Sequence, residues 1–356
     1  MSKLTKPVTR VAKWDNTKFI LIICVVLGHS MSSGLIDNGP LIKTVELFLY
    51  SFHMPLFIFI GGLFAKKTVD SVPFQYEKVV SYLLLSFFMK ILNYLSKLII
   101  TGKATFELLS DNAVSWYIFA TAVHIMIAHL LRNCNPRKIL AVSFIIAVLI
   151  GYVDEIGNTF VLSRIIVFFP IFYLGYMLKP NEVLSFTGKS WVRICSVIII
   201  IAILGGFYLT IDKAYFLRRL FTGNNPYYEF KGILHLLGGG IRIFCYLISI
   251  LVSIAVLSLI PNKRIPVLTW AGSRTLSVYA LHRAVQYIIG YGFFDQMFKD
   301  TLPRLLLPIL LIYALILTLV LSLKPFDYII WPCMNWNKLF APLMNWFRKD
   351  ESKTTK

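Results

Sequence analysis

Several basic side chains stand inside sequence stretches that are otherwise almost wholly apolar. They are His29, His53, Lys90, Arg164 and His282. An ionisable group inside a bilayer is costly, so each of these residues is a candidate functional residue. A buried imidazole can take a proton from a hydroxyl, and cations can hold an anionic cosubstrate or stabilise a developing oxyanion. These residue types therefore favour acyl transfer from a thioester to a hydroxyl.

The first apolar stretch combines charged residues and an imidazole on one helical face. Lys18 and His29 are eleven residues apart, which at about 100° per residue is about 20° beyond three full turns. Asp15 falls about 40° to the other side of His29 and joins the same face. We therefore predict that one face of this helix carries charged residues at its start, Asp15 and Lys18, and a buried imidazole, His29, further along. The alternative is a histidine that is only hydrogen-bonded within a helix bundle.

The other candidates also have structural alternatives. His53 precedes a Met-Pro pair, so it either orients His29 or satisfies the backbone of a proline kink. Lys90 either faces a ligand anion or forms a buried salt bridge, although no carboxylate lies deep in a predicted span. Arg164 and Arg242 suit anionic groups because a guanidinium forks to two oxygens. Arg242 could instead extend its charge to the membrane surface. We interpret a further histidine, at position 124, as a bridge between helices.

The composition excludes several classes of protein. The 356 residues are 57% hydrophobic and 15% charged, whereas soluble domains have about 25% charged residues. This excludes a soluble enzyme, a disordered chain and a small disulfide scaffold. The net charge of +19 comes mostly from residues between apolar runs, which indicates membrane topology and not nucleic-acid binding. The five cysteines are scattered, so neither a metal site nor a disulfide framework is predicted.

The apolar stretches predict an all-α, polytopic membrane bundle of about ten transmembrane helices. A bilayer core of about 30 Å needs about 20 apolar residues per helix. Six stretches are almost unbroken, at residues 19–36, 47–65, 112–131, 194–211, 243–262 and 305–323. Four are short or interrupted, at residues 79–101, 139–153, 156–178 and 275–294.

Basic residues between the stretches predict that both termini are cytoplasmic. We divide the chain into a basic cytoplasmic tail (residues 1–18), one membrane domain (19–323) and a basic amphipathic cytoplasmic tail (324–356). The longest outer loop, residues 212–231, is an exception because it is basic. It is either a lid or half-buried helix facing an anionic sugar or lipid headgroup, or a basic segment at the membrane interface.

Five sequence blocks resemble the membrane acyltransferase-3 superfamily, and within it the branch of fucose 4-O-acetylase-like sugar O-acetyltransferases. The blocks are WDNTKFILIICVVLGHS, FHMPLFIFIGGLF, SWYIFA, SRIIVFFPIFYLGYML and AGSRTLSVYALH. They occur in order over about residues 13–323. The first, second and last blocks are the specific ones, because the other two are largely apolar.

This resemblance implies a ten-helix acyltransferase domain that crosses the bacterial cytoplasmic membrane several times. Acetyl-CoA is the implied donor, used as a cosubstrate and not as a permanently bound cofactor. The family's motif of a basic residue, ten residues and a histidine falls on Lys18 and His29, although many members have arginine at the first position. The family's Arg-rich segment after the second span is represented only by Lys66, Lys67 and Lys78.

We therefore predict a sugar O-acetyltransferase that modifies a surface glycan or a lipid-linked precursor. His29 acts as general base or as transient acyl acceptor, and the sequence does not separate these two roles. The predicted partners are membrane lipid, the donor, the glycan acceptor and a possible second copy of the chain, without nucleic acid. The assigned residues are His29 and His53 for catalysis; Asp15, Lys18, Lys66 and Lys67 for the donor; and Lys90, Trp116, Arg164, Arg242, Arg274 and His282 for the substrate.

Two alternatives remain open. One is O-succinyl transfer or a role in polysaccharide export within the same superfamily. The other is a non-enzymatic transporter of an anionic sugar or lipid, for which two related halves with discontinuous helices are typical.

Overall fold

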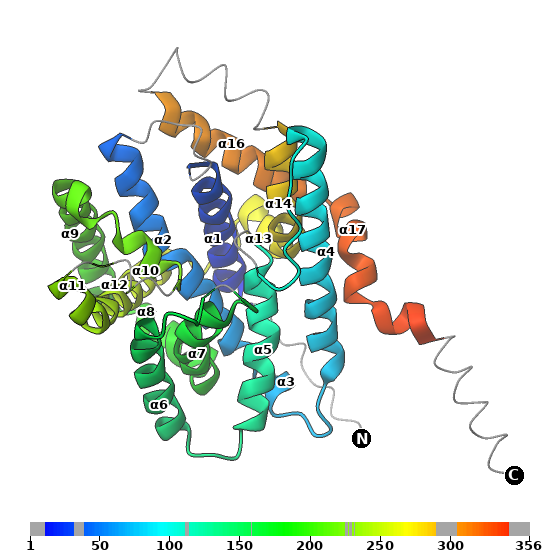
Figure 1. The fold of residues 1–356 in the computed structure, drawn as a ribbon, viewed down its shortest axis with the longest axis horizontal. Coiled ribbons are helices and arrows are strands. Elements are labelled where there is room, and N and C mark those ends of the chain that lie inside the picture. Colours follow the sequence, from blue (N-terminus) through cyan, green and yellow to red (C-terminus); the bar gives the residue numbers. More distant parts are fainter. Residues whose placement is uncertain are drawn as a thin grey trace, which may run out of the picture.

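The computed structural model describes residues 11–31, 39–110, 114–157, 159–224, 227, 230, 232–289 and 305–341. Over these residues the fold is α-helical, with one isolated β-bridge between Ser110 and Thr159. The described long helices form a bundle (Figure 1): α1 (Ala12–Met31), α2 (Pro40–Leu63), α4 (Tyr76–Thr101), α5 (Trp116–Leu130), α6 (Pro136–Leu149), α7 (Leu162–Met177), α9 (Ser190–Ala214), α12 (Gly238–Leu259), α14 (Thr275–Ile289) and α16 (Leu306–Leu321). Shorter helices lie between or after them: α3 (Lys66–Val69), η1 (Ile150–Tyr152), α8 (Pro180–Thr187), α10 (Leu217–Phe221), α11 (Ile233–Leu236), α13 (Pro266–Gly272) and α17 (Lys324–Met334).

Each apolar stretch predicted from the sequence coincides with one of the long helices. Among the described helices, α2, α4, α9 and α12 are each long and apolar enough to cross a membrane. Two bent pairs, α7 with α8 and α16 with α17, raise this number to six if each pair is one span. The chain is therefore a helical membrane protein, while ten crossings and cytoplasmic termini stay predictions. Parts of the predicted tails and spans lie outside the described residues: 1–10, 32–36, 112–113, 290–294 and 342–356, with residues 225, 226, 228, 229 and 231 of the long loop.

Several described helices begin before the predicted apolar stretches, and α1 and α2 do so by the most residues. Helix α1 begins at Ala12 and not at residue 19, and α2 begins at Pro40 and not at residue 47. Hydrogen bonding extends a helix through polar residues when neighbouring helices bury them. Asp15 is 2% exposed and Glu46 is fully buried. The described part of α1 ends at Met31, so His29 lies in its last turn.

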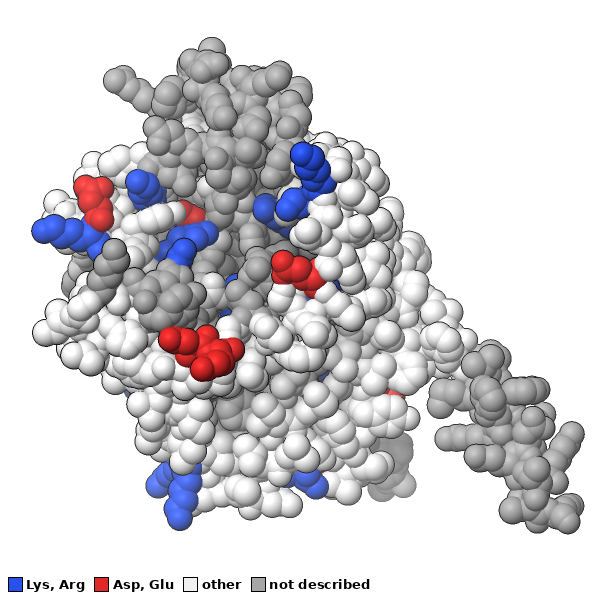
Figure 2. Space-filling model, in the orientation of Figure 1, with Lys and Arg blue, Asp and Glu red and all other residues white. Residues whose placement is uncertain are grey.

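The helix ends gather at two ends of the bundle. At the basal end, where α1, α4 and α6 begin, Arg274 pairs with Asp327 at 2.6 Å. At the distal end, where these three helices finish, Arg218 pairs with Glu46 at 2.8 Å. In Figure 2 an uncharged surface separates the Lys and Arg side chains at the lower edge from the charged side chains in the upper part of this face. Such an uncharged band is what a bilayer requires of a membrane bundle.

Helices α2 and α7 approach each other closely at two glycines. A Cβ atom on Gly62 would lie 1.9 Å from the carbonyl oxygen of Phe172, and one on Gly175 would lie 2.2 Å from the carbonyl oxygen of Phe59. Small residues at such crossings let helix backbones pack closely in membrane proteins. The contact fixes α2 against α7 with little room for change.

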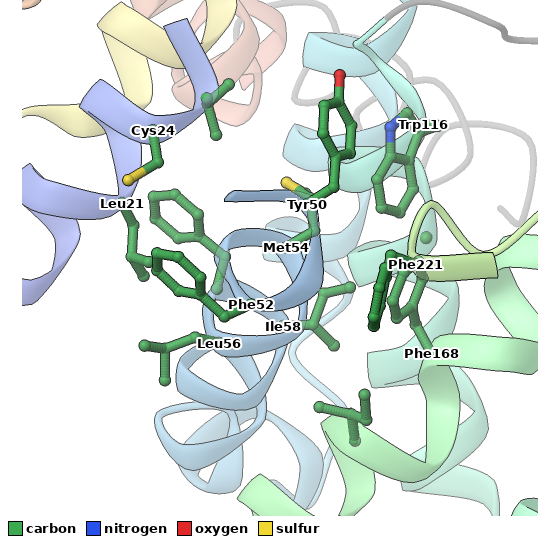
Figure 3. Close-up of a cluster of buried hydrophobic side chains, with 14 of the residues drawn as sticks. Leu21, Cys24, Tyr50, Phe52, Met54, Leu56, Ile58, Trp116, Phe168 and Phe221 are labelled. Carbon is green, nitrogen blue, oxygen red and sulfur yellow. The ribbon is translucent and has the colours of Figure 1, made fainter. Parts of the chain in front are cut away.

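Helix α2 is central to the apolar core. Figure 3 shows Leu21 and Cys24 of α1 on one side of α2, and Trp116, Phe168 and Phe221 on the other side. All five side chains are buried. Because α2 contacts both groups, it sets the distance between the helix that carries His29 and the helices that carry the distal arginines.

Candidate active site

A cavity of about 760 Å³ lies at the basal end of the bundle. Three lysines from different elements line it: Lys18 of α1, Lys78 of α4, and Lys179 just before α8. Tyr117 and Tyr279 line it as well. Tyr117 is the second residue of α5, which begins on the distal side, so the cavity extends deep into the bundle. The arrangement places cations near the basal surface and aromatic rings in the interior.

The four predicted donor residues occupy two different places. Asp15 and Lys18 both line the cavity, and Lys18 Nζ lies 2.8 Å from Asp15 Oδ1. Lys66 and Lys67 are exposed on α3 and are not part of the cavity lining. Lys66 instead lies over the ring of Tyr176, with Nζ 5.9 Å from the centroid.

Lys179 lines the cavity although the sequence analysis did not select it. A proline follows it at position 180 and Glu182 follows three residues later, a pattern typical of a helix start. Helix α7 ends at Met177, and α8 runs at 92° to it. This bend places Lys179 at the cavity, and only the helix-start pattern could have indicated it.

The first turns of α1 are held by α13, a short helix that the apolar pattern did not predict. A Cβ atom on Gly272 would lie 1.9 Å from the carbonyl oxygen of Asp15. Thr269 Oγ1 donates to Asn16 Oδ1 at 2.7 Å. These contacts position the turn that bears Asp15 and Lys18 at the cavity.

A line of aromatic rings connects the cavity to His29. The centroids of Tyr117 and Tyr279 are 5.2 Å apart, and those of Tyr279 and His282 are 5.9 Å apart. The His282 and His29 centroids follow at 5.5 Å. Two of these four residues, Tyr117 and Tyr279, line the cavity, so His29 is two ring contacts away from the cavity wall.

The two imidazoles differ in their hydrogen bonds. His282 is fully buried, and its Nδ1 lies 2.9 Å from the carbonyl oxygen of Tyr279 and 3.1 Å from that of Val278. Because a carbonyl only accepts, we assign the proton to Nδ1, which leaves a lone pair on Nε2. That Nε2 is buried and has no partner among the described residues. His29 is half-buried, and its ring forms no hydrogen bond with any described residue.

Helix α14 also fixes the turn that carries His29. Gln286 Nε2 donates to the carbonyl oxygen of Val26 and to Ser30 Oγ, each at 2.9 Å. Arg283 Nη1 donates to the carbonyl oxygen of His29 at 3.3 Å. The last carbonyls of a helix lack partners within it, and Arg283 supplies one here. Gln286 was not predicted, although its spacing of four from His282 places both on one face of α14.

His53 lies within electrostatic range of His29 but does not use the carbonyl that a proline kink would free. Its Nδ1 donates to the carbonyl oxygen of Leu49 at 2.5 Å. Pro55 lacks the N–H that would bond to Ser51, so Ser51 and not Leu49 has the freed carbonyl. The titratable groups near His29 include His53, His282, Arg283 and Arg218.

Tyr50 joins the α1 turn to the distal charged residues. A Cβ atom on Gly28 would lie 3.5 Å from Tyr50 Cε2, so this ring packs against the turn of α1 that carries His29. The same ring lies edge-on to His53, with centroids 5.1 Å apart. On its other side the guanidinium carbon of Arg218 lies 4.5 Å from the Tyr50 centroid.

A buried carboxylate lies at the distal end, one residue before the apolar stretch predicted at residues 47–65. Glu46 is fully buried in α2, with Arg218 Nε 2.8 Å from Oε1. The hydroxyl of Tyr215 donates to Oε2. Burial raises the pKa of Tyr215, and its bond to Glu46 raises the pKa further, so this phenol remains a donor.

The basic loop at residues 212–231 contains a short half-buried helix, α10, while the expected sugar or lipid headgroup opposite it stays a prediction. In α10, Leu217, Leu220 and Phe221 are buried, and Arg218 reaches Glu46. The segment is thus packed onto the distal end and is more than a surface strip.

We expect Glu46→Gln to destabilise the protein, because Arg218 would lose its negative partner in a largely buried place. Breaking a buried pair costs about 3 to 5 kcal/mol, and the partial exposure of Arg218 favours the lower figure. Thermal unfolding in detergent measures the change. The matched control is Glu182→Gln, whose exposed pair with Lys179 is 3.9 Å long and contributes less than about 1 kcal/mol. Equal midpoints for the two variants would contradict the expectation.

Two buried arginines converge on Asn224 at the distal end. Arg164 Nε donates to Asn224 Oδ1 at 3.2 Å, and Arg242 Nη2 donates to the Asn224 carbonyl oxygen at 2.8 Å. The Arg164 guanidinium lies 4.9 Å from the ring of Trp116, and that of Arg242 lies 4.9 Å from the ring of Tyr227. Arg242 is 1% exposed, so it does not extend to the membrane surface. Predicted residues Arg164, Arg242 and Trp116 therefore share one region.

Two predicted substrate residues are not part of this cluster around Asn224. Lys90 Nζ donates to the carbonyl oxygen of Leu108 at 2.7 Å, in the loop after α4. Arg274 is at the basal end, where it pairs with Asp327 and joins α14 to α17. The cavity is lined by Thr275 and Leu276, the two residues after Arg274, and not by Arg274 itself.

Comparison with known proteins adds one finding. A family model described as an acyltransferase domain, acyltransferase-3, matches residues 11–323. The match begins just before α1 and extends past the end of α16, so it includes the cavity and the paired imidazoles. No curated protein and no solved structure matches the chain significantly.

Proposed function

Because the chain belongs to the acyltransferase-3 family, we propose that it moves an acetyl group from acetyl-CoA to a hydroxyl of a cell-surface glycan or its lipid-linked precursor. We place it in the bacterial cytoplasmic membrane with both termini, and hence the basal end, in the cytoplasm. One observation carries the proposal: a lysine-lined cavity leads through two aromatic rings to the paired imidazoles of His282 and His29.

In this proposal the donor enters from the basal end. Lys18, Lys78 and Lys179 offer three cations to the phosphates of the donor. Lys18 and His29 are about 16 Å apart along the axis of α1, and an extended pantetheine arm is of similar length. Lys66 and Lys67 lie on the same end but outside the cavity, where they serve only as outer contacts for the nucleotide.

His29 is the proposed catalytic residue. As a general base it takes the proton of the acceptor hydroxyl while the oxygen attacks the thioester carbon. The carbon–sulfur bond then breaks, and the leaving CoA thiolate takes up the proton from the imidazole. In the alternative, His29 itself is acetylated and then passes the acetyl group to the hydroxyl. His282 Nε2, which has no partner in the described part of the chain, can accept a hydrogen bond from the hydroxyl or from His29, and His53 supports His29 from α2.

The acceptor approaches from the distal end. Arg164 and Arg242 are held against aromatic rings and suit an acidic or hydroxyl-rich sugar. Trp116 provides a flat apolar face beside Arg164. Lys90 lies at the same end and remains a further candidate contact.

The test uses the purified full chain in proteoliposomes with acetyl-CoA labelled in the acetyl group and a surface-glycan acceptor. We expect label in the glycan and release of CoA thiol, both dependent on the protein. Preferential use of succinyl-CoA would replace the acetyl proposal by O-succinyl transfer. Movement of glycan or lipid across the membrane without consumption of any donor would support an export or transport role instead.

We expect Lys18→Gln to raise the KM for acetyl-CoA by roughly 10-fold to 100-fold, because a charge-assisted hydrogen bond is worth about 1.5 to 3 kcal/mol. The kcat at saturating donor should change little, since Lys18 is remote from His29. Lys66→Gln is the matched control, because this lysine is exposed at the same end but outside the cavity lining. A larger rise in KM for Lys66→Gln than for Lys18→Gln would move the phosphate site to α3.

A further inference from the structure

A second concavity lies on the bundle surface, separate from the cavity at the basal end. It has a volume of about 370 Å³ and is lined by α2, α7, α8 and α12. Its lining is almost entirely apolar and includes Phe59, Leu174, Phe186 and Leu257. Helix α12 contributes two serines to its wall, Ser249 and Ser253, and the buried Oγ of Ser253 has no partner among the described residues. A hydrocarbon chain suits such a groove because the chain has no polar group that needs a hydrogen-bond partner.

Helix α8 separates this groove from the cavity. Its first residues, Pro180 and Asn181, line the cavity, whereas Val183, Phe186 and Thr187 line the groove. The helix has eight residues and runs at 92° to α7. An occupant of the groove therefore contacts the same short helix that borders the cavity.

Cations collect where the groove meets the basal end. Lys13 is 3% exposed, and its Nζ donates to Thr187 Oγ1 at 3.3 Å. Within the described part of the chain, no carboxylate pairs with this ammonium. Arg193 is exposed and close enough to repel Lys13, and Lys189 is exposed just before α9. A buried cation behind two exposed ones creates a positive potential that an anion would relieve.

Two exposed aromatic rings mark the same place as a membrane interface. Trp191 is 57% exposed and Phe186 is 41% exposed. Their rings lie edge-on at 5.9 Å. Aromatic residues next to lysine and arginine are typical of the level of the lipid headgroups. The N-terminus of α9 begins here as well, at Ser190, and its dipole favours an anion.

We infer that this groove binds one acyl chain of an anionic phospholipid of the bilayer, with the lipid phosphate at Lys189 and Arg193. The apolar lining fits the chain, and the cations at its mouth fit the phosphate. The inference does not depend on the proposed acyl transfer, because it concerns a different surface of the bundle.

The experiment measures lipid retained by the full chain after extraction from nanodiscs that contain equal amounts of phosphatidylglycerol and phosphatidylcholine, by native mass spectrometry. We expect phosphatidylglycerol to be retained preferentially by the wild-type protein. The double variant Lys189→Gln/Arg193→Gln should lose this preference by roughly 30-fold, as expected for two basic residues at a bilayer surface. The matched control Arg137→Gln/Lys138→Gln removes two exposed cations at the start of α6 and should behave as wild type.

A second pair of variants tests the groove itself. Ser253→Phe fills it and breaks no hydrogen bond, whereas Leu251→Phe enlarges a side chain of α12 that is 44% exposed. We expect retained phosphatidylglycerol to fall only in Ser253→Phe, with both variants unfolding at similar temperatures. Equal retention of the two lipids by the wild-type protein, or no change in either test variant, would overturn the inference. Displacement of phosphatidylglycerol by a stoichiometric amount of a polyprenyl phosphate would overturn it too, since the site would then be selective for that lipid.

Discussion

Replacing His29 by asparagine should lower acetyl transfer about a thousandfold, while the protein still inserts and unfolds near the wild-type temperature. Asparagine retains a polar side chain but cannot take up a proton or carry an acetyl group, and a positioned acid–base group contributes about 10² to 10⁴ in rate. The assay is release of CoA thiol in the presence of the glycan acceptor. Because the His29 ring forms no hydrogen bond with the described residues, its loss leaves no described partner unsatisfied.

His129→Asn is the control for this experiment. This imidazole is at the basal side of α5, where it stacks on Phe74 at 4.1 Å and donates to the carbonyl oxygen of Val69. Its replacement should affect stability more than rate. Activity of His29→Asn within tenfold of wild type would remove His29 from the mechanism. Mass analysis after mixing with acetyl-CoA alone separates the two roles, because only a transient acyl-imidazole adds an acetyl group to the protein.

The second large effect is expected at the crossing of α2 and α7. Gly62→Ala places a methyl group 1.9 Å from a backbone carbonyl oxygen, and Gly175→Ala places one at 2.2 Å. Neither oxygen can rotate away, so the helices must separate, at a cost of about 3 kcal/mol or more. We expect a lower unfolding temperature and less monodisperse protein in fluorescence-detected size exclusion.

The adjacent glycine supplies the control for this second prediction. A Cβ atom on Gly61 meets only the Tyr117 hydroxyl, at 3.9 Å, which is an ordinary contact. Gly61→Ala should therefore resemble the wild type in both measurements. If Gly62→Ala and Gly61→Ala were equally stable, the close approach of α2 and α7 would be refuted.

The sequence predicts the long helices well because each contains an apolar stretch. It also places Asp15 and Lys18 on one helical face, and in the structure both residues line the cavity. The expected bridging role of His124 is confirmed, because its Nε2 donates to the carbonyl oxygen of Ile165 across α5 and α7. These successes share one cause: local spacing on a helix determines which residues face the same way.

The missed features depend on contacts between segments far apart in the sequence. Arg218 and Tyr215 of the distal loop bury Glu46. In the sequence of α2 alone, Glu46 instead resembles an exposed acid at the start of a span. Gln286 donates a hydrogen bond to the backbone carbonyl of Val26 in α1. Gly272 is required because the backbone of Asp15 leaves no room for a Cβ atom there. Apolar periodicity does not register such contacts.

The rings from Tyr117 to His29 lie between the basal cavity and the distal arginines. The cavity with its lysines ends at Tyr117 and Tyr279, while the paired arginines lie at the opposite end of the bundle. On the proposed function, the nucleotide and the sugar each stay in their own compartment, and only a two-carbon fragment changes sides. A cell could then decorate its exterior from a metabolite that never leaves the interior, without opening a pore through which ions would leak.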